Sequence, residues 1–228
     1  MESINKRQFT IDLLKRFTLN LEYLTNDDKN NINKLGINLY GGDLNELYSI
    51  NECLVNDKEY YESKLVSFSK EDDIYKLTIK DYSISLIYSQ IKEIITGLID
   101  ILDDILPLGT VVKLKKEYLH KFINNNEIEE AEVVIVNRFI FKNGINAYFP
   151  YAGVVYPIGF VGNSNAIQFS SALIDEVVHR GYSDEKDEVY TYLLKNELIL
   201  DKKMRSFGFA SKEEREKYNE LIKGEVDD

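Results

Sequence analysis

The sequence predicts an α+β protein, with a small, mainly antiparallel β-sheet domain, an N-terminal helix–hairpin–helix extension and C-terminal helices. Two observations support this fold class. Up to residue 105, apolar residues recur every three or four positions in two long segments, as they do on one face of a helix. From residue 106 to 182, short β-branched runs alternate with turn-forming residues, which is typical of strands. We therefore expect three parts, at residues 1–105, 106–182 and 183–228.

The N-terminal extension begins with a predicted helix from about Asn5 to Leu24. Its apolar residues fall on one face, at Phe9, Leu13, Leu14, Phe17, Leu21 and Leu24. We interpret it as a helix that packs on the core and exposes a basic side. Residues 25–33 are polar and rich in asparagine, which predicts a loop, and residues 44–54 predict a second helix.

A hairpin and a long helix complete the extension. Residues 64–69 and 75–80 predict two strands, because apolar and polar residues alternate in the second of them. Residues 83–105 carry the strongest helical pattern, an apolar stripe of Ile84, Ile87, Tyr88, Ile91, Ile94, Ile95, Leu98, Ile101, Leu102 and Ile105. So wide a stripe predicts contact with both the extension and the β-sheet domain, which would make the chain one cooperative unit.

The β-sheet domain opens at Leu106 with a helix stop followed by a turn. Pro107 ends the preceding helix, because its ring removes a backbone donor and clashes with the previous turn. Gly109 permits a turn, and the β-branched run after it starts a strand. Further strands are predicted at residues 132–142, 147–156 and 167–170.

Two helices are predicted after this domain. Ser183 is the expected N-cap of the first, which would run to about Leu200 with acidic residues at the positive end of its dipole. The last helix starts at the capping box formed by Ser211 and Glu214 and would end by Gly224.

Composition restricts the class of partner and the compartment. The net charge of the 228-residue chain is −11, which argues against nucleic-acid binding, because phosphate contacts need a basic face. A cationic partner is the natural complement. The single cysteine, Cys53, rules out an internal disulfide framework and fits a reducing cytoplasm. No apolar run is long enough for a membrane span, so we expect a cytoplasmic protein.

No motif predicts catalysis, a metal site or a cofactor. His120 and His179 lack metal-ligand spacing, and residues 162–165 look like a turn rather than a nucleophile elbow. We therefore expect no enzymatic activity and no cofactor. One alternative stays open, a metal-dependent hydrolase that uses an acidic cluster of Asp100, Asp103 and Asp104.

The most informative side chains are four aromatic residues around the third predicted strand of the β-sheet domain. They are Tyr148, Phe149, Tyr151 and Tyr156, with prolines and a glycine between them. A small sheet has difficulty burying both faces of so aromatic a strand. Some of these rings should therefore be exposed or be covered by another element or chain, and both coverage by the chain's own helices and contact with a partner protein stay open. The four rings are our candidate partner-binding residues, and at least two of them should remain exposed if they form a docking surface.

Four blocks resemble a bacterial domain-of-unknown-function family, in the order in which that family has them. They are Leu106–Val112 (LPLGTVV), Val133–Phe139 (VVIVNRF), Tyr151–Gly159 (YAGVVYPIG) and Ile174–Tyr182 (IDEVVHRGY). Members of the family are encoded in Gram-positive bacteria beside LXG toxins of type VII secretion systems. The resemblance covers about 95 of the 228 residues and carries no catalytic residue.

The resemblance implies an accessory role in type VII secretion. The expected function is a non-enzymatic chaperone or targeting adaptor that binds a cognate LXG toxin in the cytoplasm. The alternative is an immunity protein that neutralises the toxin domain, with an acidic surface that would mimic nucleic acid if the toxin is a nuclease.

Overall fold

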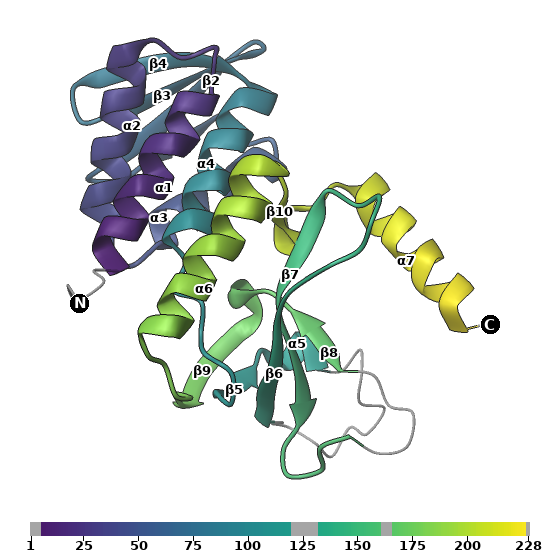
Figure 1. The fold of residues 1–228 in the computed structure, drawn as a ribbon. Helices are drawn as coiled ribbons and strands as arrows, with labels where there is room; N and C mark the ends of the chain where they lie inside the picture. Colours follow the sequence, from purple (N-terminus) through teal and green to yellow (C-terminus); the bar gives the residue numbers. More distant parts are fainter. Residues whose placement is uncertain (1–5, 120–131, 161–165, 227–228) are drawn as a thin grey trace. The chain divides into compact units, whose positions relative to one another are not determined.

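The computed structural model describes residues 6–119, 132–160 and 166–226, and its fold is α+β (Figure 1). The predicted fold class, with helices at both ends of the chain around antiparallel sheets, is confirmed. The chain divides into two compact units. The first comprises Met1–Asp104 and Lys195–Lys202, and the second comprises Ile105–Leu194 and Lys203–Asp228.

The first unit contains four α-helices: α1 (Lys6–Asn20), α2 (Asn26–Leu39), α3 (Asn45–Val55) and α4 (Tyr88–Leu102). A π-helical turn, η2 (Asn196–Asp201), packs against α1 and α4. The predicted helices at residues 5–24 and 44–54 are confirmed as α1 and α3. Among the described residues, no helix has the length and apolar character needed to cross a membrane.

The predicted loop at residues 25–33 is wrong, because α2 begins there. Thr25 is its N-cap: the hydroxyl of Thr25 accepts a hydrogen bond from the Asp28 amide at 3.2 Å, and the Asp28 carboxylate accepts one from the Thr25 amide at 2.9 Å. This capping box satisfies two backbone donors at the start of the helix. Ile32, Leu35 and Leu39 form the buried face of α2. The polar outer face of the helix concealed this period in the sequence.

The sheet of the first unit has four antiparallel strands in the order β1-β2-β3-β4. They are β1 (Tyr60–Glu62), β2 (Val66–Glu71), β3 (Ile74–Ile79) and β4 (Tyr82–Ile87). The predicted hairpin is confirmed as β2 and β3. The predicted helix start at residue 83 is wrong: β4 pairs with β3 from Tyr82 to Ile87, and α4 begins only at Tyr88. Ile84 and Leu86 are both buried and are two residues apart, which is the period of a strand. The predicted helix instead used Ile84 and Ile87, which are three residues apart.

The sheet of the second unit has the strand order β10-β7-β6-β5-β9, and β8 pairs with β7. Its strands are β5 (Val111–Leu114), β6 (Glu132–Phe141), β7 (Ala147–Val155), β8 (Ile167–Phe169), β9 (Ile174–His179) and β10 (Arg205–Ser206). All pairs are antiparallel except β10 with β7. The predicted strands at 132–142, 147–156 and 167–170 are confirmed, whereas β9 and β10 were not predicted.

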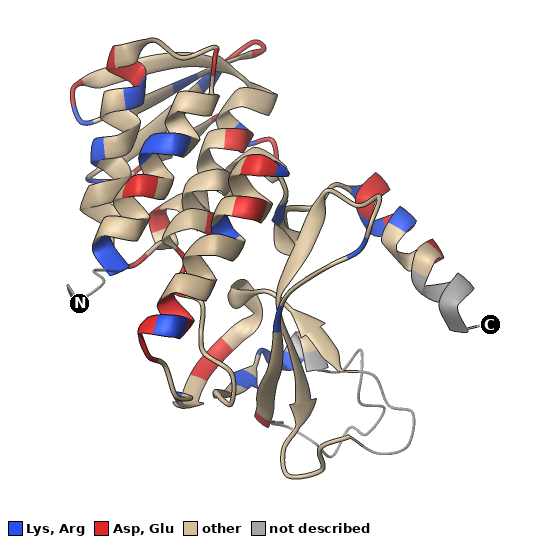
Figure 2. Ribbon diagram, in the orientation of Figure 1, with Lys and Arg blue, Asp and Glu red and all other residues tan. Residues whose placement is uncertain are grey.

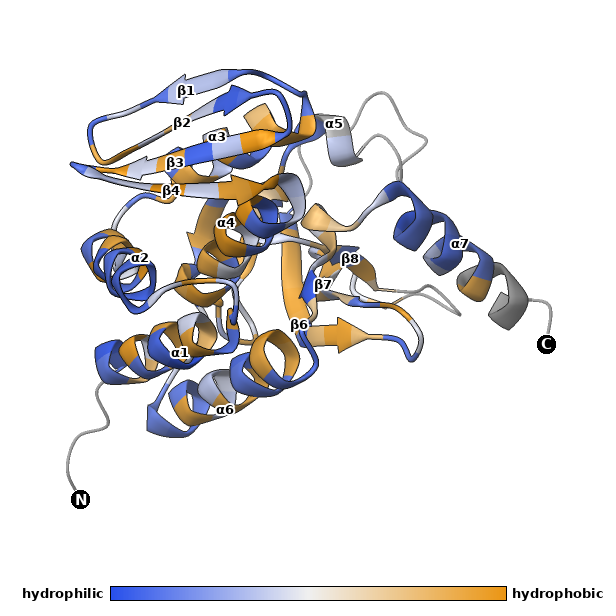
Figure 3. Cartoon of the chain, turned by 90° about the horizontal axis from the view of Figure 1, so that it is seen from above, coloured by the Kyte–Doolittle hydropathy of each residue, from blue (hydrophilic) through white to orange (hydrophobic). Residues whose placement is uncertain are grey.

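Short and long helices accompany this sheet: α5 (Lys116–Leu119), η1 (Ser171–Leu173), α6 (Glu185–Lys195), η3 (Phe207–Phe209) and α7 (Lys212–Val226). The N-cap of α6 is Asp184 rather than the predicted Ser183, because the Asp184 carboxylate accepts hydrogen bonds from the amides of Lys186 and Asp187. The capping box of Ser211 and Glu214 is confirmed. The helix α7 continues past Gly224 to Val226 and is hydrophilic along most of its length (Figure 3).

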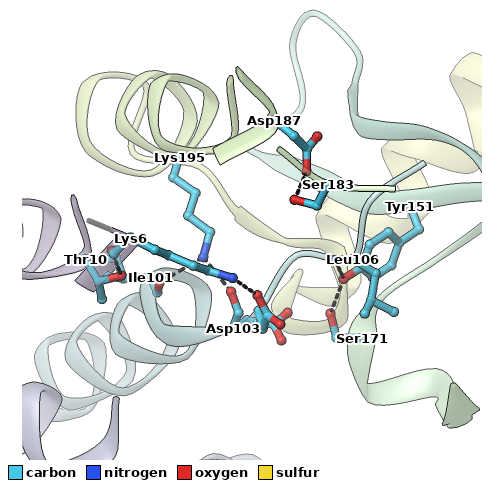
Figure 4. Close-up of polar contacts among 11 residues, drawn as sticks. Lys6, Thr10, Ile101, Asp103, Leu106, Tyr151, Ser171, Ser183, Asp187 and Lys195 are labelled. Carbon is cyan, nitrogen blue, oxygen red and sulfur yellow. Dashed lines mark hydrogen bonds and ion pairs between the residues drawn. The ribbon is translucent and has the colours of Figure 1, made fainter. Parts of the chain in front are cut away.

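A buried lysine closes the end of α4 in the first unit. The ammonium of Lys195 donates to the carbonyl oxygens of Ile101 at 2.8 Å and Asp103 at 2.6 Å (Figure 4). These carbonyls lie at the negative end of the α4 dipole, where a cation is favourable. Burial disfavours the charged form and lowers the pKa of Lys195 to about 8, and the carboxylates of Asp103 and Asp100 oppose this shift.

The Lys195→Met variant tests this contact through its pH dependence. In the unfolded chain the pKa of a lysine is about 10.4, above the folded value, so between the two values the unfolded chain binds more protons. The free energy of unfolding of the wild type should therefore rise relative to Lys195→Met as the pH increases through that window. Guanidinium titrations at about pH 7 and about pH 10 measure it. The exposed Lys58→Met is the control, and a difference that falls with pH would contradict the assignment.

Ile94→Asp tests the helix α4 as the centre of the first unit. The side chain of Ile94 is fully buried, so the substitution places an uncompensated charge in the core. We expect it to cost several kcal/mol against a total stability of about 5–15 kcal/mol, and to unfold the first unit. Ile74→Asp is the matched control, because Ile74 is 46% exposed. Thermal unfolding followed by circular dichroism measures both.

A broader prediction is that Ile94→Asp also unfolds the sheet that starts after Leu106, in the same transition as the first unit. A second unfolding transition that survives in the Ile94→Asp variant would contradict it.

Candidate functional site

Three stretches of the second unit meet at Thr110. The amide of Gly109 donates to the carbonyl of Ile135 at 2.9 Å, and the amide of Ile135 donates to the carbonyl of Thr110 at 2.9 Å. The hydroxyl of Thr110 accepts a hydrogen bond from the amide of Gly181 at 3.0 Å and donates to the carbonyl of Pro107 at 2.7 Å. Thr110 is fully buried. Its hydroxyl and backbone therefore fix the loop before β5, the middle of β6 and the turn after β9 to one another.

Two glycines make this arrangement possible. Gly109 has a φ of +78°, a left-handed conformation that residues with a side chain seldom adopt. At Gly181 a Cβ atom would lie 2.1 Å from the carbonyl oxygen of Leu108, which is inside the van der Waals distance. The approach of these two backbone segments therefore requires glycine at residue 181.

Large apolar side chains are exposed next to these contacts. We call the set Leu108, Val136, Val178 and Tyr182 the Thr110 patch; its members belong to the three stretches that meet at Thr110, and all are exposed. Tyr182 is the most exposed, at 82% of its full area. Exposed apolar residues are ordinary when they are scattered singly, but a group on a fixed backbone is typical of an interaction site.

Acidic residues accompany the Thr110 patch. Figure 2 shows them at the first turn of α6 and on β9. Residues 174–188 carry six carboxylates and two basic side chains; the carboxylates are Asp175, Glu176, Asp184, Glu185, Asp187 and Glu188. Glu176 forms an ion pair with Lys113 at 3.4 Å. The segment is therefore net negative where it adjoins exposed apolar side chains.

A buried arginine holds the start of α6 against β6 in this unit. The guanidinium of Arg138 pairs with the carboxylate of Asp187 at 2.5 Å and lies over the ring of Tyr190, and the hydroxyl of Ser183 donates to Asp187 at 3.0 Å. Two further nitrogens of Arg138 are buried without a hydrogen-bond partner. The attraction within such a pair is largely offset by the loss of hydration of both charges, so the pair adds little net stability. Removing one member is nevertheless costly, because it leaves the other charge buried without a partner, and the pair therefore fixes the geometry.

The four candidate partner-binding rings do not meet the condition for a docking surface, which required at least two exposed rings. Tyr148, Phe149 and Tyr151 are buried, and only Tyr156 is exposed. The strand β7 lies inside the sheet between β6 and its other neighbours β8 and β10. Phe149 stacks on Phe207 of η3, with 4.2 Å between ring centroids, and also packs on Tyr218 of α7.

Tyr151 has a structural hydrogen bond as well as a buried ring. Its hydroxyl accepts from the amide of Leu106 at 3.0 Å, at the point where the chain enters the second unit (Figure 4). The ring packs on Phe169 of β8, with 5.3 Å between centroids. Tyr156 is therefore the member of the predicted set that remains placed to contact a partner.

The acidic residues of the predicted cluster lie near the ammonium of Lys195, whose charged form the carboxylates of Asp103, Asp100 and Asp104 favour. Asp100 is buried, Asp104 pairs with Lys6, and the backbone carbonyl of Asp103 binds Lys195 (Figure 4). Within the described parts of the chain, no group of histidine, cysteine and acidic residues could hold a metal ion. His179 is exposed on β9 and Cys53 is buried in α3. His120 and residues 162–165 lie outside the described residues.

Phe149→Asp distinguishes a core residue from a docking residue. Because Phe149 packs between Phe207 and Tyr218, we expect a loss of several kcal/mol in the free energy of unfolding. Tyr156→Asp is the matched control, since Tyr156 is 56% exposed, and its effect should stay within about 0.5 kcal/mol. Urea unfolding measures both. Equal free energies of unfolding for the two variants would contradict the assignment of Phe149 to the core.

Comparison with known proteins adds one match. No curated protein and no solved structure is significantly similar to the chain. Residues 105–190 match the model of a family described as "Domain of unknown function (DUF4176)". The match supports the expected resemblance to a domain of unknown function, and it includes the loop, strands and turn that meet at Thr110.

Proposed function

We propose that this protein is a non-enzymatic accessory protein of type VII secretion, which binds a cognate LXG toxin in the cytoplasm as a chaperone or targeting adaptor. The observation that carries the proposal is the Thr110 patch. Its apolar side chains are exposed on a backbone that buried hydrogen bonds hold in place. The resemblance of the four sequence blocks supplies the identity of the partner.

The distribution of exposed apolar residues supports a binding role. More than half of the exposed large apolar side chains in the described residues lie between Leu108 and Tyr190, within the segment that matches the family model. A surface of this kind gains free energy when a partner removes it from water. The first unit, which has its own helices and sheet, offers a separate surface for a contact with the export machinery.

The acidic surface favours an immunity protein as the second candidate. The net charge of −11 and the carboxylates beside the Thr110 patch resemble the charge of a nucleic acid. If the toxin is a nuclease, such a surface could occupy its basic active site.

Co-expression with an LXG toxin, sought among the genes that neighbour this one, tests the proposal. We expect the tagged protein to co-purify with the full-length toxin through size-exclusion chromatography, and deletion of the gene to abolish toxin export. A toxin that elutes alone, and is exported normally without this protein, would refute the chaperone or adaptor role.

Growth rescue separates the two candidates. An immunity protein must restore growth to cells that express the toxin domain alone, whereas a chaperone or adaptor need only support export. Rescue without any effect on export would support the immunity role.

A further inference from the structure

We propose that the Thr110 patch is a docking site for a cationic amphipathic helix of a partner protein. The proposal rests on the proposed function only for the identity of that partner. The contacts themselves follow from three properties of the second unit: exposed apolar side chains, an acidic border and a protected sheet edge.

The apolar side chains define the centre of the docking site. Leu108 and Tyr182 are far apart in the sequence, but their backbones are neighbours in space, because the backbone of Gly181 lies against the carbonyl of Leu108. Val136 follows Ile135, whose amide and carbonyl bind Thr110 and Gly109. Tyr182 is of a residue type that is enriched among the residues that dominate binding energy in protein interfaces, and the leucine and valines add aliphatic surface that a partner can remove from water.

The border defines the charge of the occupant. The first turn of α6 begins shortly after Tyr182 and contains Glu185, Asp187 and Glu188, while Asp175 and Glu176 lie on β9. The Arg138–Asp187 and Lys113–Glu176 ion pairs use two of these carboxylates internally. Residues 174–188 still carry six carboxylates against two basic side chains, and this net negative charge favours a partner with lysine or arginine beside its apolar residues.

The edge of the sheet excludes addition of a strand as the mode of docking. The strand β9 is the edge, but its pairing with β5 has register shifts after Val111 and after Lys113. Bulges and exposed charges such as Asp175 and Glu176 are the means by which sheets prevent strand pairing at an edge. The occupant therefore binds through side chains, as a helix does when it lays its apolar face on a surface.

The docking site is preorganised. Thr110 and Arg138 are buried, and Arg138 pairs with the partly buried Asp187, so the loop, the strand and the start of α6 keep their positions without a partner. Binding then loses little conformational entropy of the backbone.

A synthetic helical peptide is the direct probe. Its sequence repeats leucine and lysine at helical spacing over about five turns, and it carries a fluorescent label for anisotropy titration against the full chain. We expect the Leu108→Ser/Tyr182→Ser variant to bind at least about tenfold more weakly than the wild type. Leu19→Ser/Val55→Ser is the matched control, because Leu19 and Val55 are exposed at 65% and 61% in the first unit. This control should bind as the wild type does.

A charge series tests the acidic border independently. Asp175→Asn/Glu188→Gln should weaken binding of the leucine–lysine peptide by about threefold at low salt, and less at high salt. Asp72→Asn/Asp73→Asn, in an exposed turn of the first unit, is the control. A matched leucine–glutamate peptide should not bind. This series keeps the proposal testable if the Leu108→Ser/Tyr182→Ser variant fails to fold.

The outcomes separate the docking site from the proposed function. Equal binding by the patch variants and their controls would overturn the docking site, as would tighter binding of a strand-forming lysine–valine peptide. If the wild type self-associates and the Leu108→Ser/Tyr182→Ser variant does not, the patch is instead a contact with a second copy of the chain. If the patch variants lose the peptide but keep the toxin in co-purification, the docking site stands and the toxin is not its occupant. If they keep the peptide and the toxin does not co-purify even with the wild type, the proposed function fails and the site is disproved as well.

Discussion

The buried hydroxyl of Thr110 is the constraint on which the second unit depends. A hydroxyl is one donor and a double acceptor, and here it donates to Pro107 and accepts from Gly181. The same residue uses its backbone carbonyl to bind Ile135. Pro107, Ile135 and Gly181 are therefore tied to one residue, and a valine of similar shape would leave the Gly181 amide without this acceptor.

This constraint explains how an exposed apolar surface can coexist with a stable fold. Apolar residues on a mobile loop would collapse onto the nearest core or promote aggregation. Leu108 and Tyr182 are instead attached to backbone that glycine at residue 181 packs closely and that Thr110 fixes. The fixed backbone therefore keeps both residues exposed, and rotation of their side chains does not bury them.

The sequence predicted the elements more accurately than the surface. The strands β6 and β7 and the helices α1 and α3 followed from periodicity, because each buries one face at a regular spacing. The start of α4 was misplaced because Ile84 and Ile87 fit the helix period, whereas Ile84 and Leu86 fit the strand period, and only the pairing with β3 decides between them. The helix α2 was missed because its outer face is polar, although Thr25 and Asp28 carried a capping signal.

The candidate site was harder to predict, since exposure depends on what the rest of the chain covers. Phe149 of β7 packs on Phe207 and Tyr218, which follow it by more than 50 residues and gave no sign of that role. The Thr110 patch did leave a signal. Three of the four blocks that resembled the family contain the residues that meet at Thr110, and glycine marks two of the contacts. What the sequence could not supply was the pairing of these blocks with one another.

Lys195 shows a different dependence on distant sequence. The chain leaves the first unit after Asp104, returns at Lys195 and leaves again after Lys202. In the returning segment Leu198, Ile199 and Leu200 are buried, and η2 packs against α1 and α4. The carbonyls that end α4 thus find their cation more than 90 residues later. The first unit is complete only when a segment that follows residues 105–194 is present, so the N-terminal half of the chain cannot reach its final fold during synthesis before most of the second unit has been made.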